Sequence, residues 1–171
     1  MQREKESAVA VIPLYVRVAA RAGELLRQRG ETIGVAESSA GGLISAALLA
    51  IPGASSYFVG GASVYTTKAK MELVGVNAAE FALDRAATET HALVLARALQ
   101  RRLGTTWGIG ETGAAGPTGN RYGDAAGHCC LAVSGPRERS STLETGAADR
   151  WSNMEAFAEA ALRLLIDVLE Q

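Results

Sequence analysis

The stretch from Glu37 to Gly42 places two adjacent hydroxyls and two glycines between a short apolar run and a helix-like pattern. Where a strand turns into a helix, backbone N–H groups are unpaired and the helix dipole favours negative charge. Ser38 at such a turn could act as a nucleophile, bind an anion or simply cap the helix. Spacing alone favours the cap, because the stretch matches neither a P-loop nor a Gly-x-Ser-x-Gly elbow.

A second polar cluster runs from Tyr65 to Lys70 and follows a strand-like segment. A lysine near a serine can serve as a general base if desolvation or another cation lowers its pKa. Tyr65 could relay the proton or orient the pair. The plainer alternative is a short helix with two solvated lysines, Lys68 and Lys70, and the sequence alone favours that alternative.

The third cluster is the glycine-rich stretch 111–120, which we interpret as a long loop that begins at the end of a strand. It contains the hydroxyl of Thr112 and the glycines Gly113 and Gly116. Long loops inside a small domain are more often functional than ornamental. Glu111 and Asp124 flank the stretch, but spacing does not establish a two-carboxylate site.

Metal binding and disulfides are not expected. His91 and His128 are far apart and lack the spacing of metal ligands. The two cysteines, Cys129 and Cys130, are adjacent on a predicted strand, so their side chains should point to opposite faces and pack in a core. Such cysteine usage fits a reducing, cytoplasmic environment.

Hydrophobic periodicity predicts the elements that must position these clusters. Helices alternate with strands at first, but the last three strands have no helix between them, which indicates a layered α/β fold with a mixed sheet. The expected helices are 13–29, 41–50, 67–74, 88–103 and 153–169, and the expected strands are 32–36, 57–65, 106–110, 127–134 and 140–145.

Bulk composition limits the partners. With 171 residues, 48% of them hydrophobic and a net charge of −1, the chain is expected to form one domain over residues 1–171 that binds neither nucleic acid nor membrane. Residues 1–12 are expected to be disordered or to begin the N-terminal helix.

Five short motifs, in order, resemble the C-terminal domain family of the competence/damage-inducible protein CinA. The family pattern is approximately A-E-S-C-T-G-G, P-G-S-S, Y-S-N-E-A-K with L-x-G-V, S-G-I-A-G-P-x-G and G-D-R. The corresponding residues here are Ala36-Glu37-Ser38-Ser39-Ala40-Gly41-Gly42, Pro52-Gly53-Ala54-Ser55-Ser56, Tyr65-Thr66-Thr67-Lys68-Ala69-Lys70 with Leu73-Val74-Gly75-Val76, Thr112-Gly113-Ala114-Ala115-Gly116-Pro117-Thr118-Gly119, and Ala148-Asp149-Arg150.

The resemblance implies a three-layer α/β/α sandwich and an amidase that converts nicotinamide mononucleotide to nicotinate mononucleotide and ammonia, without a metal or cofactor. Carried over by position, Ser38 is the nucleophile, Lys70 its base and Tyr65 an assisting group. The implied substrate-binding residues are Ser39, Gly41, Gly42, Thr112, Gly113, Gly116 and Arg150, the last through the substrate phosphate. The resemblance also implies a homo-oligomer, which the apolar side of the N-terminal helix favours.

The chain departs from the family pattern in its substrate-facing loop, where 120–124 reads Asn-Arg-Tyr-Gly-Asp. Two alternatives therefore stay open. The same machinery could act on a different small amide or nucleotide, or the chain could be an inactive nucleotide- or partner-binding module. The relation between Ser38 and Lys70 distinguishes the enzymes from the inactive module.

Overall fold

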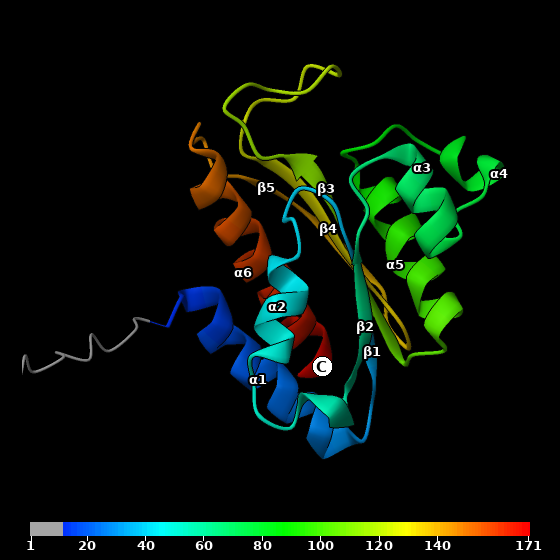
Figure 1. Ribbon diagram of the computed structural model, residues 1–171, viewed down its shortest axis with the longest axis vertical. Helices are drawn as coiled ribbons and strands as arrows, with labels where there is room; N and C mark the ends of the chain where they lie inside the picture. The colour runs from blue at the N-terminus through cyan, green and yellow to red at the C-terminus, as the bar shows by residue number, and fades with distance from the viewer. Residues whose placement is uncertain (1–11) are drawn as a thin grey trace, which may run out of the picture.

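The computed structural model describes residues 12–171, so the expectation for the first twelve residues lies, except for Ile12, outside the described residues. Five strands and six α-helices form, which is one short helix, at Ala78–Phe81, more than the sequence predicts (Figure 1). The strands are β1 (Ile33–Glu37), β2 (Phe58–Ser63), β3 (Trp107–Ala114), β4 (His128–Ser134) and β5 (Arg139–Glu144). The helices are α1 (Leu14–Arg29), α2 (Leu43–Leu49), α3 (Thr67–Ala69), α4 (Ala78–Phe81), α5 (Glu89–Leu103) and α6 (Arg150–Leu169), with a 3-10 turn η1 (Ala54–Ser56) and a π-helical turn η2 (Lys70–Val74).

The strands form one mixed sheet in the order β2-β1-β3-β4-β5. β1 lies parallel to β2 on one side and to β3 on the other. β3, β4 and β5 follow one another antiparallel, and the connections between them contain no crossover helix. The predicted mixed sheet is confirmed.

Helices cover both faces of the sheet, which confirms the three-layer sandwich (Figure 1). α1, α2 and α6 share the larger core with one face, where Leu26, Ile44 and Phe157 are fully buried. α5 covers the other face and packs tightly on β3. A side chain at Gly110 would overlap the Ala92 carbonyl, so this glycine permits the close approach of helix to strand.

Most predicted element boundaries lie within two residues of those in the structure, and two differ by more. β3 continues to Ala114, so Glu111 and Thr112 are strand residues rather than the start of a loop. They pair with Leu131 and Cys130 of β4, and this long-range ladder holds the glycine-containing segment extended. α6 begins at Arg150, three residues early, because the Asp149 side chain accepts a hydrogen bond from the Ser152 N–H at 2.8 Å and caps the helix.

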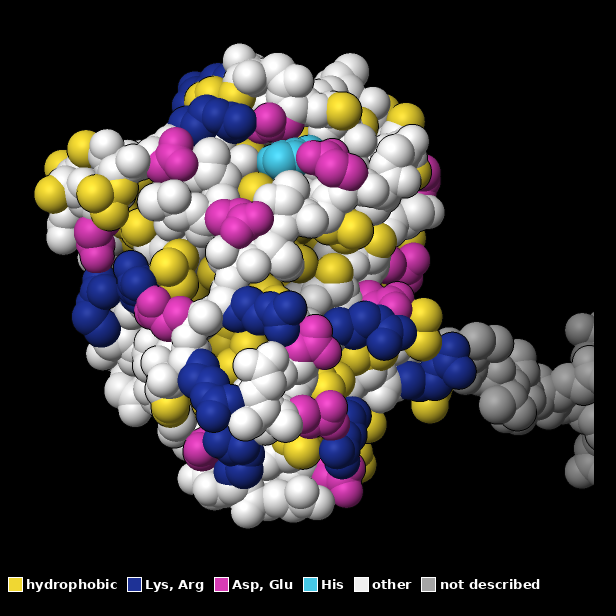
Figure 2. All heavy atoms as spheres, turned by 180° about the vertical axis from the view of Figure 1, so that it is seen from behind, with side chains coloured by type: hydrophobic (Ala, Val, Ile, Leu, Met, Phe, Trp, Pro, Cys, Tyr) yellow, Lys and Arg dark blue, Asp and Glu magenta, His cyan; other side chains and the backbone are white. Residues whose placement is uncertain are grey.

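The apolar side of α1, on which the expected self-association partly rests, packs against α6 within the same chain. Self-association stays a prediction. The two cysteines are buried on opposite faces of the sheet, as expected. Acidic and basic side chains are interspersed over the face in Figure 2. In the described part of the chain, each helix is too short or too polar to cross a membrane.

Candidate active site

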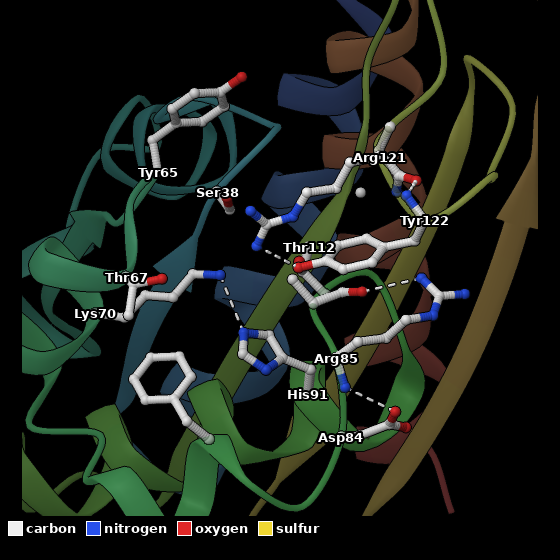
Figure 3. Close-up of a pocket in the computed structure, with 14 residues that line it drawn as sticks. Ser38, Tyr65, Thr67, Lys70, Asp84, Arg85, His91, Thr112, Arg121 and Tyr122 are labelled. Atoms are coloured by element: carbon white, nitrogen blue, oxygen red, sulfur yellow. Dashed lines mark hydrogen bonds between the residues drawn. The ribbon is translucent and has the colours of Figure 1, made fainter.

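A hollow of about 550 Å³ lies at the carboxyl end of β1, beside β3 (Figure 3). The chain leaves β1 toward β2 on one side and later returns as β3 on the other, and open α/β sheets bind ligands at such a switch point. This main pocket is lined by Ser38, Tyr65, Thr67, Lys70, Phe81, Asp84, Arg85, Ala86, His91, Thr112, Gly113, Asn120, Arg121 and Tyr122. The first two predicted clusters and part of the third therefore meet here.

The turn after β1 is organised by Glu37 rather than by a serine cap. The Glu37 carboxylate accepts hydrogen bonds from the backbone N–H groups of Ile44 and Ser45, both at 3.0 Å, and from the Ser45 hydroxyl at 2.6 Å. It thereby pairs backbone N–H groups in the first turn of α2. The N-cap residue of this helix, Gly42, has no side chain that could do so. The interpretation of Ser38 as a helix cap is wrong, because the carboxylate one residue earlier already fills that role.

A second buried carboxylate holds the same turn from β3. Glu111 is fully buried and accepts hydrogen bonds from the backbone N–H of Ser38 at 2.8 Å and of Ala40 at 2.9 Å, and from the Ser39 hydroxyl. Burial raises the pKa of Glu111, and these hydrogen bonds oppose the rise by stabilising the carboxylate. The backbone N–H groups of this turn, which the sequence offered as a site for an external anion, thus donate to two carboxylates of the protein itself.

This arrangement separates the roles of the two adjacent serines. Ser39 is committed to Glu111, whereas Ser38 lines the main pocket and is 9% exposed. Gly41 and Gly42 have φ values of 67° and 105°, which let the chain turn into α2. The structure therefore places Ser38 at the hollow and gives the two glycines a conformational role.

Lys70 is buried beside His91, contrary to the solvated pair that the sequence favoured. It is 5% exposed, and its Nζ lies 3.0 Å from Nε2 of His91 (Figure 3). Burial lowers the pKa of Lys70, while the charge of Glu111 opposes this shift. Burial and then the Lys70 charge lower the pKa of His91 to about 4, so its imidazole is neutral at pH 7. Only Lys68 of the predicted pair is exposed.

Tyr65 lies at the rim of the hollow. It is 65% exposed, and its ring extends above Ser38 with the hydroxyl directed away from Lys70 (Figure 3). Tyr65 lines both the main pocket and an adjoining hollow of about 200 Å³. It is thus placed to contact a bound molecule that extends from one hollow into the other.

Thr112 supports the opposite wall from inside β3. Its buried hydroxyl accepts a hydrogen bond from the Ala87 N–H at 3.2 Å, and Ala87 has an unusual positive φ of 59°. The Ala87 carbonyl lies 3.0 Å from Nε2 of His128. Burial disfavours the charged form of His128, but hydrogen bonds to Glu144 and Ala87 outweigh it and raise the pKa. Thr112 and His128 together fix the segment that precedes α5.

Arg150 does not line the main pocket that Ser38 lines. Its guanidinium donates a 2.7 Å hydrogen bond to the Gly116 carbonyl and lines the adjoining hollow, together with Ser39 and Gly113. The two hollows share Tyr65, Gly113 and Asn120. The predicted substrate-binding residues are therefore divided between neighbouring spaces, except Gly41 and Gly42, which line neither.

The loop 118–124 closes the far side of the main pocket. Arg85 binds Asp124 with both guanidinium nitrogens, at 2.6 and 3.0 Å, and Arg121 and Tyr122 line the space between this ion pair and Ser38. Sequence reasoning gave no role to Arg85, Arg121, His91 or Glu111. Glu111 was the one with a visible signal, since it is a lone charge in the apolar run of β3.

We expect His91→Ala to raise the pKa of Lys70. Burial is the leading cause of the lowered Lys70 pKa, so admitting water returns that pKa toward 10.5. The neutral amine then forms at higher pH. An NMR titration of the Lys70 side chain from pH 5 to 12 tests this, with His91→Gln as the volume-matched control. An unchanged Lys70 pKa in His91→Ala would contradict it.

Within residues 12–171, no group of three or more His, Cys, Asp and Glu side chains is arranged to hold a metal ion.

Comparisons with known proteins identify relatives of this chain. The family model described as the CinA C-terminal domain matches residues 16–169. A CinA-like protein of Picosynechococcus sp. strain PCC 7002 is 40% identical over 128 residues, which cover 75% of this chain and 29% of that protein. One from Chloroherpeton thalassium is 38% identical over 152 residues, covering 86% and 36%. The chain thus spans about a third of the length of these curated relatives.

Solved structures share the fold. The competence/damage inducible protein CihA from Agrobacterium tumefaciens superposes with a TM-score of 0.85 at 28% identity, over 95% of this chain and 99% of that one. A competence-damaged protein (CinA) superfamily protein from Escherichia coli has a TM-score of 0.84 at 22% identity, over 98% and 99%, and supports the fold alone. Because the family model spans residues 16–169, this chain belongs to the CinA C-terminal domain family.

Proposed function

We propose that this chain is an amidohydrolase in which Ser38 is the nucleophile and Lys70 its general base. The observation that carries the proposal is the burial of Lys70 in the pocket that Ser38 lines. Desolvation favours the neutral amine, which is the form that can accept the serine proton. Family membership supports the same chemistry, because this chain keeps the serine and the lysine of the family pattern as Ser38 and Lys70.

The reaction takes place in two stages. In the first, Lys70 takes the hydroxyl proton of Ser38, and the oxygen attacks the carboxamide carbon of the substrate. The C–N bond then breaks, Lys70 returns the proton to the leaving nitrogen, and ammonia departs. In the second stage, Lys70 takes a proton from a water molecule, whose oxygen attacks the ester carbon. The bond to the Ser38 oxygen breaks, and Lys70 returns the proton to that oxygen. The carboxylic acid gives its proton to ammonia, so the sum is one amide and one water converted to one carboxylate and one ammonium ion.

The substrate we propose is nicotinamide mononucleotide, which becomes nicotinate mononucleotide. The main pocket, of about 550 Å³, is in the size range of small-molecule sites and continues into the adjoining hollow. A ring carrying the amide can reach Ser38 while the phosphate end of the nucleotide stays in the main pocket, on the side of the loop 118–124. Gly113 lines both hollows.

A second candidate keeps the machinery and changes the substrate. Arg121 and Tyr122 come from the loop that departs from the family pattern, and both line the main pocket. This observation favours a different anionic carboxamide as the alternative substrate.

Ammonia release from nicotinamide mononucleotide by the purified protein tests the proposal. Nicotinate mononucleotide, which has no amide nitrogen to lose, is the matched negative control. A panel of other small carboxamides distinguishes the two candidate substrates. Absence of ammonia from every carboxamide would contradict the amidohydrolase itself.

A further inference from the structure

The loop 118–124 is fixed over the pocket before any ligand arrives. Asp124 binds the Arg85 guanidinium through both oxygens and accepts a 2.8 Å hydrogen bond from the Asn120 side chain. The hydrogen bonds from Arg85, followed by that from Asn120, lower the pKa of Asp124 to about 2, so the ion pair persists at neutral pH. Asn120 Oδ1 also accepts from the Tyr122 N–H at 2.9 Å. These contacts hold the loop in one conformation.

Tyr122 in turn fixes the position of Arg121. The Tyr122 ring lies between two guanidinium groups, 5.0 Å from that of Arg85 and 4.9 Å from that of Arg121. Arg121 Nη2 also donates a hydrogen bond to the Tyr122 hydroxyl at 2.8 Å. Figure 3 shows the Arg121 guanidinium extended from the loop into the hollow, toward Ser38 and Thr112.

Among the described residues that line the hollow, Arg121 is a cation without an ion-pair partner. Arg85 is paired with Asp124, Lys70 is buried against His91, and the pKa of His91 is lowered to about 4. Asp84 accepts the backbone N–H of Arg85 at 2.8 Å. Among residues 12–171, no acidic side chain forms an ion pair with Arg121.

We propose that Arg121, positioned by Tyr122, recognises the anionic group of the substrate, and that this group is a phosphate monoester. The inference rests on the proposed function, because it assigns a substrate contact within the same pocket. A guanidinium has five donors, and only one is used on Tyr122, so a bidentate contact with phosphate oxygens is available. Arg150 is the other arginine nearby, but it lines the adjoining hollow and not the main pocket.

Calorimetric titration with three probes tests this assignment. Nicotinate mononucleotide and nicotinate riboside differ only in the phosphate, and inorganic phosphate supplies that group alone. None of the three has an amide, so the wild-type protein can be used without turnover. The variants are Arg121→Gln, Arg121→Lys and Arg137→Gln, the last changing an exposed arginine of the β4–β5 turn as the matched control.

Arg121→Gln should weaken the binding of nicotinate mononucleotide about 10- to 100-fold. It should change the affinity for nicotinate riboside by less than about twofold. Arg121→Lys should bind the nucleotide more tightly than Arg121→Gln but less tightly than wild type, since lysine keeps the charge but cannot form the bidentate contact. Arg137→Gln should bind as wild type. Equal weakening of the nucleotide and the riboside would overturn the proposal, because Arg121 would then recognise the ring carboxylate or support the fold. The proposal would also be overturned if the wild-type protein bound neither nicotinate mononucleotide nor inorganic phosphate.

The titration tests the Arg121 assignment and the ammonia assay tests the activity, so either proposal can be contradicted without the other. If the phosphate discrimination depends on Arg121 but no carboxamide releases ammonia, the binding assignment stands and the amidohydrolase does not. If ammonia is released but Arg121→Gln keeps the wild-type preference for the nucleotide, the enzyme stands and Arg121 is not its phosphate contact.

Discussion

Ser38→Ala and Lys70→Met should each lower kcat for ammonia release by at least about 10³-fold, because each removes one half of the nucleophile–base pair. Methionine fills the buried site of Lys70 without supplying a base. The double variant should be scarcely slower than either single variant, since groups that act as a unit are not additive. Steady-state rates on nicotinamide mononucleotide, or on the carboxamide that the panel identifies, provide the measurement.

Neighbouring residues supply matched controls for this result. Lys68 is exposed two residues before Lys70, so Lys68→Met should keep the wild-type kcat. Ser55 is exposed in η1, and Ser55→Ala should also leave kcat unchanged. Circular dichroism and thermal melting should show that all variants are folded. If a well-folded Ser38→Ala protein turned over at the wild-type rate, the nucleophile would have to be reassigned.

Glu111→Ala should destabilise the protein by about 3–5 kcal/mol and lower its Tm by about 10 °C. The change leaves the backbone N–H groups of Ser38 and Ala40 and the Ser39 hydroxyl without their buried acceptor. Each unsatisfied buried donor costs about 1–3 kcal/mol, and water entering the space recovers part of that cost. Urea denaturation and thermal melting measure the loss.

Two further variants make the Glu111 result specific. Glu111→Gln keeps one acceptor oxygen but turns an NH₂ group toward donors, so its stability should lie between Glu111→Ala and wild type. Glu72 is an exposed carboxylate on η2, and Glu72→Ala should change stability by less than about 0.5 kcal/mol. Wild-type stability in Glu111→Ala would mean that the turn holds Ser38 without the buried carboxylate.

The Glu111 variant also separates positioning from chemistry. Because Glu111 binds the backbone of Ser38 and not its hydroxyl, its removal should reduce activity by displacing the nucleophile. The loss of kcat should therefore accompany the loss of stability, whereas Ser38→Ala should lose kcat with little change in stability.

Local pattern determined most of the architecture. Hydrophobic periodicity of 3.6 or 2 residues reports which face of an element is buried, and this is why the helices, the strands and the mixed sheet could be predicted from the sequence. The short motifs identified the family, and they placed Ser38, Tyr65, Lys70 and Thr112 among the candidate residues. The structure brings all four to one hollow.

The tertiary structure decided the state of these groups. The residue pattern alone favoured a solvated Lys70, although the family resemblance implied a base, and packing against α5 buries it and lowers its pKa. Glu111 lies 73 residues from Ser38 in sequence, and the pairing of β1 with β3 brings them together. Burial, pKa and charge pairing depend on neighbours that are distant along the chain, and no local pattern records them. The sequence alone determined the fold and the residue types of the site, while tertiary contacts decided their protonation and partners.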